Sequence, residues 1–458
     1  MNSEDSVAAD AVAAGPTAQS KLLASGALTS RQLTEAVLGA IARENPAINA
    51  TVAVYASEAL AAADQADARR AAGESGPLFG IPVAVKDDLD IAGKVTGRGS
   101  NAMSSAAASD TPLVAAMRAA GMVIVAKSAL PELAIFGFTE SDALGITRNP
   151  HNTAHTPGGS SGGSAALVAA GAVSIATASD GAGSIRIPAA CCGLVGFKPT
   201  QGTMPSSGGW HDLSTQGGLA ARVADSALFL DTFGTFHFGA GPTSLVEAAS
   251  TDPAPLRIGV SYSAAAATKA LPLDPRVAAA IESAAELFRA AGHTVSRVDV
   301  PYGADAKALT IRYLAGIRDG AAETDDPSKL EKRTKGIARL GKPFSKRVVE
   351  RAKKLGRSWG DGLHDKLGVD VLLTPVMSGP AVPVEHWKGK GAVRTVLGMN
   401  AFYPYTAQWN HAGTPAVSLP AGVTAEEGLP LAIQLIARRD DDARLMALAG
   451  QYERLRAV

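Results

Sequence analysis

Short apolar segments that resemble β-strands alternate with helix-like segments along much of this 458-residue chain. A helix-like segment from Pro112 to Gly121 is followed at once by the apolar run Val123–Ala126. The same order returns later, where Ile258–Val260 precedes a helix that opens at Asp274 and ends at Gly292, and the alternating segment Thr294–Val298 follows. Strands that alternate with helices of this length are typical of α/β folds layered around a parallel or mixed sheet. The sequence therefore predicts an α/β fold.

The chain contains no repeat and no linker at which it could be divided, so we expect one domain over residues 21–458. Hydrophobic residues make up 46% of the chain, which is enough to fill a sizeable core. Residues 1–20 are rich in alanine and lack periodicity, and we expect them to form a poorly ordered arm. Regular structure is expected from Thr29, which together with Gln32 fits a helix capping box.

The charge balance argues against several classes of partner. The chain has 43 basic and 43 acidic residues, so its charge gives no reason to expect binding to nucleic acid or to an anionic membrane. The longest uncharged run, Asn149–Ser179, has too few large apolar residues to span a bilayer. The first residues carry acids and lack the basic region of a secretory signal. We therefore expect a soluble, cytoplasmic protein.

The two cysteines, Cys191 and Cys192, are adjacent and lie in a stretch rich in alanine and glycine. Such a pair supports neither a disulfide framework nor a metal site, and we expect both to be buried as small apolar residues. No other cluster of His, Cys, Asp or Glu has the spacing of metal ligands. The sequence thus predicts no metal.

The most unusual region is Pro157–Gly202, which holds two turns rich in glycine and serine, Gly158–Ser164 and Asp180–Ser184. Glycines allow backbone N–H groups to converge without interference from a Cβ atom, which suits the binding of a phosphate or an oxyanion. The first turn cannot be a phosphate-binding loop of the Walker type, because no lysine follows its last glycine.

Two other short motifs are weak. Gly97–Ala102 has the glycine spacing of a dinucleotide-binding loop but follows no apolar strand. Gly159–Gly163 matches the pattern G-x-S-x-G, in which Ser161 would be a nucleophile. A nucleophile elbow requires a buried strand before the serine, and here a polar loop precedes it. The elbow remains an alternative at this point.

Lys86 is the more promising base. It follows five apolar residues, Ile81–Val85, which should form a buried strand. Desolvation at the end of such a strand would lower the pKa of the lysine enough for it to act as a base, while Asp87 and Asp88, if close, would oppose that shift. None of the eight histidines has a sequence context that marks it as a base.

Three segments together resemble the amidase signature family: Gly80–Asp90, Gly158–Gly171 and Ser179–Gly202. The resemblance covers roughly residues 27–450 and extends through four further segments, Gly121–Ala134, Thr147–Asn152, Trp409–Gly422 and Leu429–Asp442. The resemblance implies a single α/β/α domain with a large, twisted mixed sheet covered by helices. It also implies hydrolysis of a small-molecule amide without a metal or organic cofactor. Family members are often dimers, so a homodimer is the assembly that the resemblance suggests.

The family's Ser–cis-Ser–Lys triad corresponds to Ser184, Ser160 and Lys86 in this sequence. By this resemblance Ser184 is the nucleophile that accepts the acyl group. Ser160, on a cis peptide bond, passes the proton between Ser184 and Lys86.

The resemblance also implies an oxyanion hole made by the N–H groups of Gly181, Ala182, Gly183 and Ser184, with Ser161, Asp180 and Arg186 as supporting residues. Ala182 departs from the family, which commonly has glycine there. A methyl group at this position is compatible with the loop if its φ angle is negative.

Two alternatives share the fold. One is the amidase subunit of a tRNA-dependent amidotransferase, although that subfamily usually has Gln where this chain has Ile187. The other is a non-catalytic protein that kept the fold, which the intact triad argues against. The substrate is the least determined point. Aromatic residues of a segment that borders the pocket in similar proteins suggest an apolar or aromatic acyl group, namely Phe402, Tyr403, Tyr405 and Trp409, with His411 beside them.

Overall fold

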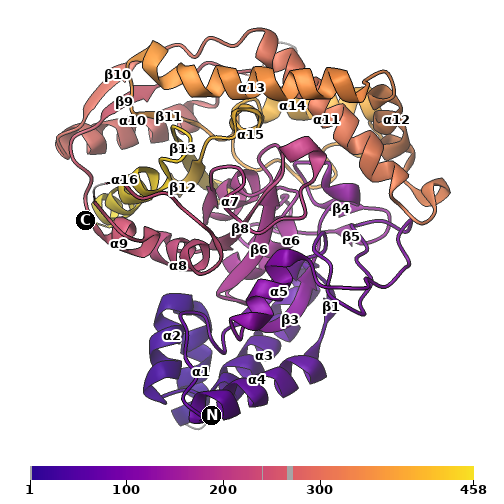
Figure 1. The fold of residues 1–458 in the computed structure, drawn as a ribbon, viewed down its shortest axis with the longest axis vertical. Helices are drawn as coiled ribbons and strands as arrows, with labels where there is room; N and C mark the ends of the chain where they lie inside the picture. The colour runs from indigo at the N-terminus through magenta and orange to yellow at the C-terminus, as the bar shows by residue number, and fades with distance from the viewer. Residues whose placement is uncertain (1–2, 240, 266–271, 458) are drawn as a thin grey trace.

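A mixed sheet of eleven strands runs through the computed structural model of the protein, which describes residues 3–239, 241–265 and 272–457 (Figure 1). In spatial order the strands are β1 (Thr51–Val54), β3 (Val123–Ser128), β2 (Pro82–Lys86), β6 (Ile175–Asp180), β8 (Thr215–Ala220), β7 (Val195–Lys198), β12 (Ala416–Val423), β13 (Pro430–Ala437), β11 (Val371–Pro375), β9 (Arg257–Val260) and β10 (Thr294–Arg297). β2 is parallel to β3 and β6, and β9 is parallel to β10 and β11, whereas the other neighbours are antiparallel. The predicted α/β fold with a mixed sheet is confirmed. A separate hairpin is formed by β4 (Glu140–Ser141) and β5 (Gly145–Ile146).

Helices lie against the sheet and extend at both ends of the molecule (Figure 1). They are α1 (Ser3–Ala13), α2 (Pro16–Ser25), α3 (Ser30–Ile48), α4 (Ala56–Ala71), α5 (Pro112–Ala119), α6 (Gly162–Ala169), α7 (Arg186–Cys192), α8 (Val223–Phe233), α9 (Leu245–Ser250), α10 (Pro275–Ala290), α11 (Ala304–Ala322), α12 (Lys332–Gly341), α13 (Lys346–Leu367), α14 (Ala392–Phe402), α15 (Ala407–Ala412) and α16 (Asp442–Arg456). The described residues also form three short 3₁₀ turns, η1 (Glu132–Ala134), η2 (Trp210–Asp212) and η3 (Pro327–Lys329).

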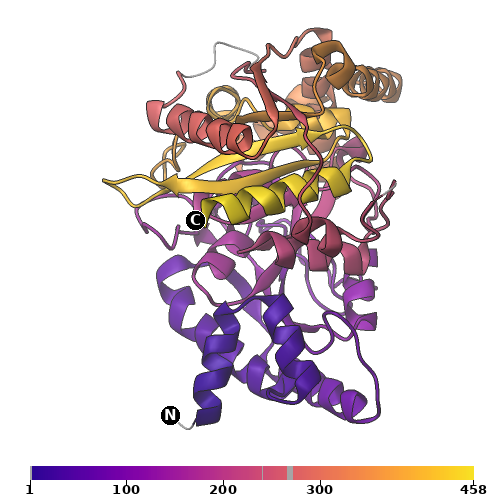
Figure 2. The same ribbon diagram turned by 90° about the vertical axis from the view of Figure 1, so that its left-hand side faces the viewer.

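Strand β13 shows how both faces of the sheet are covered. Successive residues of a strand point to opposite faces. Ile436 belongs to a cluster with Trp409 of α15 and Leu363 of α13, whereas Leu431 packs with Val277 of α10. Figure 2 shows α16 beside β12 and β13 as well. Strands whose residues are all buried, such as β2, β11 and β13, are apolar runs, whereas the edge strand β10 is largely exposed.

The N-terminal segment differs from its expected form. We expected residues 1–20 to be poorly ordered, but the chain is helical in α1 and again from Pro16. Ala11 and Val12 are 2% and 4% exposed and belong to the main core. Gln19 is fully buried, and its Nε2 donates to the Ala11 carbonyl at 2.9 Å while its Oε1 accepts from Ser174 at 2.7 Å. Alanine-rich helices without a strong apolar stripe can pack closely because their side chains are small, and the periodicity test misses them.

Several local predictions are confirmed. Thr29 and Gln32 form both hydrogen bonds of the capping box at the start of α3. Asp274 caps α10, since its side chain accepts a hydrogen bond from the backbone of Arg276. Both cysteines are free and buried. No helix among the described residues is both long enough and apolar enough to cross a bilayer.

Candidate active site

Lys86 lies at the end of β2, and its side chain is fully buried. Its Nζ donates hydrogen bonds to Ser160 Oγ at 2.8 Å and to Ser179 Oγ at 2.7 Å. Ser179 Oγ in turn donates to Asp88 Oδ2 at 2.5 Å, and that oxygen lies 3.3 Å from Lys86 Nζ. Burial lowers the pKa of Lys86, and the negative charge of Asp88 opposes this shift without reversing it. The geometry therefore favours a lysine that can be neutral.

The two aspartates after Lys86 have different partners. Asp88 lies beside Lys86, as the sequence suggested, whereas Asp87 forms an ion pair with Lys127 of β3, with 3.0 Å between Asp87 Oδ1 and Lys127 Nζ. Burial raises the pKa of Asp87, and the positive charge of Lys127 opposes that rise. Of these two carboxylates, Asp88 is therefore the one that acts directly on Lys86.

Ser160 lies in the loop before α6, and the peptide bond between Gly159 and Ser160 is cis. A Cβ atom on Gly159 would come within 2.7 Å of the backbone at Phe136 and Phe138, so this position requires glycine. The next residue, Ser161, donates its backbone N–H to the carbonyl of Ser184 at 3.3 Å. The Ser160 loop is thus attached directly to the loop that carries Ser184.

The nucleophile-elbow alternative does not fit this arrangement. Ser161 is fully buried, and no strand precedes it in the loop at residues 151–157. Its Oγ accepts from the backbone N–H of Ser179 at 3.4 Å. Ser160 and Ser184, in contrast, both line a cavity that does not include Ser161 among its described lining residues. Ser161 is therefore not available as a nucleophile.

The loop from Gly181 to Ser184 joins β6 to α7, and its two central residues differ in what they require. Gly183 has φ +123°, and a Cβ atom there would lie 2.5 Å from Thr406 Oγ1. Ala182 is not among the described residues with positive φ, so its methyl group causes no backbone strain. The substitution that departs from the family therefore lies at the tolerant position of the loop.

The expected oxyanion donors do not all remain available. Gly183 N–H already donates to Asp180 Oδ1 at 2.6 Å, which contradicts its expected role as a free donor. The side chain of Asp180 accepts this hydrogen bond from its own loop, and aspartate readily forms local bonds of this kind. The N–H groups of Gly181, Ala182 and Ser184 have no hydrogen-bond partner in the described part of the chain.

Asp180 and Arg186 fix the position of the loop at residues 181–184. Both are fully buried, and Arg186 Nε and Nη2 donate to the two carboxylate oxygens at 2.9 and 3.0 Å. Burial alone would raise the pKa of Asp180, but the Arg186 charge and hydrogen bonds lower it to about 2. Arg186 also donates to Asn410 Oδ1 at 2.6 Å and to Gln434 Oε1 at 2.7 Å. This charged, fully paired network fixes the position of the loop against α15 and β13.

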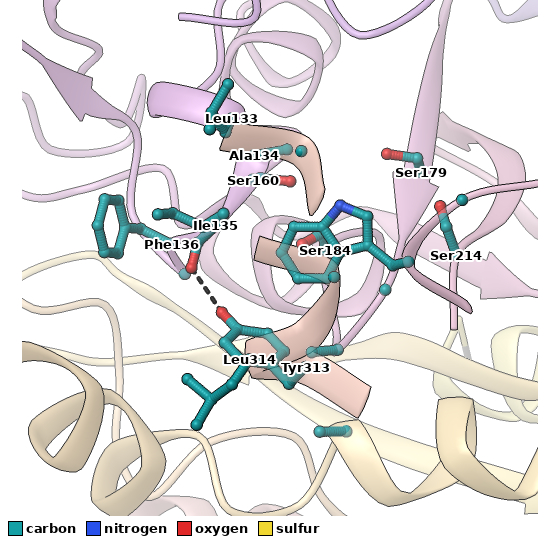
Figure 3. Close-up of a pocket in the computed structure, with 18 of the residues that line it drawn as sticks. Leu133, Ala134, Ile135, Phe136, Ser160, Ser179, Ser184, Ser214, Tyr313 and Leu314 are labelled. Carbon is teal, nitrogen blue, oxygen red and sulfur yellow. Dashed lines mark hydrogen bonds between the residues drawn. The ribbon is translucent and has the colours of Figure 1, made fainter. Parts of the chain in front are cut away.

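A cavity of about 640 Å³ is lined by Ser160 and Ser184 (Figure 3). Its volume is that of a typical small-molecule site. Ser160, Ser179 and Ser184 line its polar side. Most of the remaining wall is apolar and includes Leu133, Ile135, Phe136, Ile187, Trp210, Leu309, Tyr313, Leu314, Val396, Leu397, Met399 and Tyr403. The cavity therefore brings two serines of the expected triad to one apolar pocket, with Lys86 hydrogen-bonded behind them.

A model of the Amidase family matches residues 32–446 of the chain. The chain belongs to the Amidase family. Among its relatives, the Mycobacterium tuberculosis protein named "Putative amidase AmiB2" is 42% identical, over 98% of this chain and 97% of its own length. One glutamyl-tRNA(Gln) amidotransferase subunit, from Synechococcus, is 34% identical, over 95% of each chain. The solved structure of 6-aminohexanoate cyclic dimer hydrolase complexed with substrate is 26% identical, with a TM-score of 0.84 over 97% of each chain. This amidase is therefore a hydrolase that acts on amide bonds.

The aromatic residues expected around the pocket are mostly in the core of the amidase. Tyr403 lines the cavity, but Phe402, Tyr405, Trp409 and His411 are not among its lining residues and are buried elsewhere. Trp409, for example, stacks on Trp359 with 5.7 Å between ring centroids. These four predictions are wrong because the segment runs from the end of α14 through a turn into α15, so its side chains point in different directions and few of them face the cavity.

Two aromatic residues that the sequence did not single out, Trp210 and Tyr313, also line the cavity. Trp210 and Tyr313 pack edge to face with ring centroids 5.1 Å apart, and Tyr313 donates its hydroxyl hydrogen to the Ile135 carbonyl at 2.6 Å (Figure 3). Trp210 belongs to a turn in which residues 208–212 all have positive φ. No local pattern signals that shape, because only the first two of these residues are glycines.

Proposed function

We propose that this amidase cleaves a small-molecule carboxylic amide through an acyl-enzyme on Ser184. Ser184 Oγ attacks the amide carbon and forms a C–O bond, while its proton passes through the hydroxyl of Ser160 to neutral Lys86. The same two groups return a proton to the amide nitrogen. The C–N bond then breaks, and ammonia or an amine leaves. Water attacks the acyl group by the reverse relay and releases the carboxylic acid.

The observation that carries this proposal is the hydrogen bond of 2.8 Å from Lys86 Nζ to Ser160 Oγ, at a lysine with no exposed surface. A base must be within hydrogen-bond reach of the proton that it receives and must be unprotonated at working pH. The distance satisfies the first condition. The lowered pKa of Lys86, caused by burial, supports the second.

We assign the oxyanion hole to the N–H groups of Gly181, Ala182 and Ser184. Gly183 is left out because its N–H is bonded to Asp180. Such donors stabilise the negative charge that develops on the carbonyl oxygen, and the loss of one typically lowers the rate by ~10²–10³-fold. In this proposal Asp180 and Arg186 act indirectly, by holding the loop in its conformation.

The apolar wall suggests which acyl group the amidase accepts. Trp210, Tyr313 and Met399 line the cavity together with the serines. An apolar or aromatic acyl group would be removed from water there, which favours binding in proportion to the area buried. A charged acyl group would lose its hydration on this wall, and two charged residues elsewhere in the lining, Arg98 and Glu323, already form an ion pair with each other at 3.6 Å.

The tRNA-dependent amidotransferase alternative is less favoured. Ile187 stands where that subfamily usually has glutamine, and it is one of the apolar residues that line the cavity. The position thus offers apolar contact and not a polar amide. A cytoplasmic location and a homodimer stay predictions.

A fluorophosphonate probe tests the proposal, because it reacts with an activated serine. We expect the adduct on Ser184 and expect Ser184→Ala to lose labelling and amide hydrolysis together. Ser214→Ala is the matched control, since Ser214 lines the same cavity and has no role in the proposed chemistry. Peptide mapping that places the adduct on Ser161, or turnover that survives in Ser184→Ala, would refute the assignment.

A further inference from the structure

Gln216 is a polar side chain of the cavity that the proposed chemistry does not use. Gln216 lies on β8, is 8% exposed and lines the cavity. Its Oε1 is buried and accepts no hydrogen bond from the described residues. A buried acceptor without a partner is costly, and native proteins seldom retain one without a reason.

The sheet places this side chain next to the triad. Gln216 is the register partner of Ser179 on the neighbouring strand β6. Directly opposed residues of antiparallel strands point to the same face and lie about 5 Å apart at Cβ. Ser179 also lines the cavity and accepts a hydrogen bond from Lys86. The amide group of Gln216 therefore lies on the side of the cavity where proton transfer takes place.

A second unpartnered acceptor lies on the same side. Asp88 lines the cavity, and its Oδ2 accepts from Ser179, whereas its Oδ1 is buried without a partner among the described residues. Gln216 Oε1 and Asp88 Oδ1 would both be satisfied by a ligand that supplies hydrogen-bond donors. An amide nitrogen that carries hydrogen is such a donor, and the oxygen of an ester is not.

We propose that Gln216 Oε1 accepts a hydrogen bond from the N–H of the amide that is cleaved, and that this contact selects amides over esters. The inference rests on the proposed function, because it needs the amide nitrogen to lie between Ser184 and the side of the cavity that carries Ser179. It identifies the substrate class as amides with at least one hydrogen on nitrogen. Gln216 would thereby orient the leaving group for protonation through Ser160.

The test compares an amide with the ester of the same acid in purified full-length enzyme. The acyl group is chosen first, as one whose primary amide the wild-type enzyme hydrolyses, starting with phenylacetamide and methyl phenylacetate. The measured quantity is the ratio of kcat/KM for the amide to kcat/KM for the ester. This ratio does not depend on the fraction of active enzyme in each preparation. A site built around a hydrogen-bonding group discriminates strongly against an analogue that lacks it.

We expect Gln216→Leu to lower this ratio by ~10–100-fold, mainly through the amide, because removing one partner of a buried hydrogen bond has that order of effect. Gln216→Glu keeps an acceptor oxygen and should retain more of the ratio than Gln216→Leu. Gln201→Leu is the matched control, because Gln201 has a buried, unpartnered Nε2 but does not belong to the described cavity lining. It should leave the ratio unchanged.

An unchanged ratio in Gln216→Leu would overturn the inference, as would an equal loss of both activities in a variant that is folded and labelled at Ser184. Failure of the proposed function looks different. In that case the wild-type enzyme is not labelled at Ser184, or Ser184→Ala retains hydrolysis, and both results are independent of the Gln216 variants.

Discussion

Two lysines on neighbouring strands of the sheet are both removed from solvent, yet their surroundings differ in kind. Lys127 of β3 forms a direct ion pair with Asp87, with 3.0 Å between Lys127 Nζ and Asp87 Oδ1, and donates to Thr96 Oγ1 at 2.7 Å. Lys86 of β2 also lies near a carboxylate, with 3.3 Å between its Nζ and Asp88 Oδ2, but its shortest contacts are the hydrogen bonds that it donates to two serine hydroxyls at 2.7 and 2.8 Å. A carboxylate in direct contact stabilises the ammonium form, whereas hydroxyls bind either form of the amine.

The comparison shows that burial alone does not make a lysine a base. Both lysines lie on fully buried strands of the same sheet. They differ in the groups that contact Nζ and in whether those groups line the cavity. The partners of Lys86 line the cavity, whereas Asp87 and Thr96 are absent from its described lining. In the proposed mechanism Lys86 is thus connected to the cavity by hydroxyls that can pass a proton, whereas Lys127 forms an ion pair away from it.

The largest expected effect separates the two lysines by activity. Lys86→Ala should lower kcat/KM for amides by ~10²–10⁴-fold, the usual contribution of a general base. The variant should remain folded, because it removes an amine whose burial is already unfavourable to its charged form. Circular dichroism and steady-state kinetics on the same sample check both statements. Near-normal turnover in Lys86→Ala would remove lysine from the mechanism.

The second expected effect is on stability. Lys127→Met keeps most of the side-chain volume but leaves Asp87 buried without its ion-pair partner, and Asp87 is only 1% exposed. Breaking a buried pair in this way typically costs about 3–5 kcal/mol in the free energy of unfolding. Urea titration measures the loss, and Lys127→Met combined with Asp87→Asn should recover part of it. If the single variant is as stable as wild type, the ion pair is not structural.

The three residues of the proposed triad could be chosen from the sequence because each lies in a local motif. The apolar run before Lys86 predicted a buried strand, and the glycine turns around Ser160 and Ser184 predicted loops with exposed backbone donors. The resemblance then assigned their roles. Local patterns of this kind survive in a single sequence because they depend on residues that are close along the chain.

The rest of the site depends on tertiary structure. Trp210, Tyr313 and Gln216 come from η2, α11 and β8, and no periodicity or spacing joins them. Sequence could have placed Gln216 on a strand, but its orientation toward the cavity depends on its register with Ser179. The donor role expected for Gly183 failed for a similar reason, because the direction of its N–H is set by the fold of the loop around Asp180.

The smallest expected effect is a shift in pH dependence, and it tests why Lys86 and Lys127 differ. If Lys86 must be neutral, kcat/KM falls on the acid side as Lys86 becomes protonated. The charge of Asp88 raises the pKa of Lys86, against the larger lowering by burial, so Asp88→Asn should lower that pKa further. A lower pKa keeps the lysine neutral to lower pH, and the acid limb of the kcat/KM profile should therefore move toward acid.

The control for this shift is the neighbouring aspartate. Asparagine at position 88 still offers an acceptor oxygen to Ser179, which limits the change in geometry. Asp87→Asn removes a carboxylate that faces Lys127, so the acid limb should stay in place even if the protein is less stable. A limb that moves toward neutral pH in Asp88→Asn, or that moves equally in both variants, would mean that the titrating group is not the amine of Lys86.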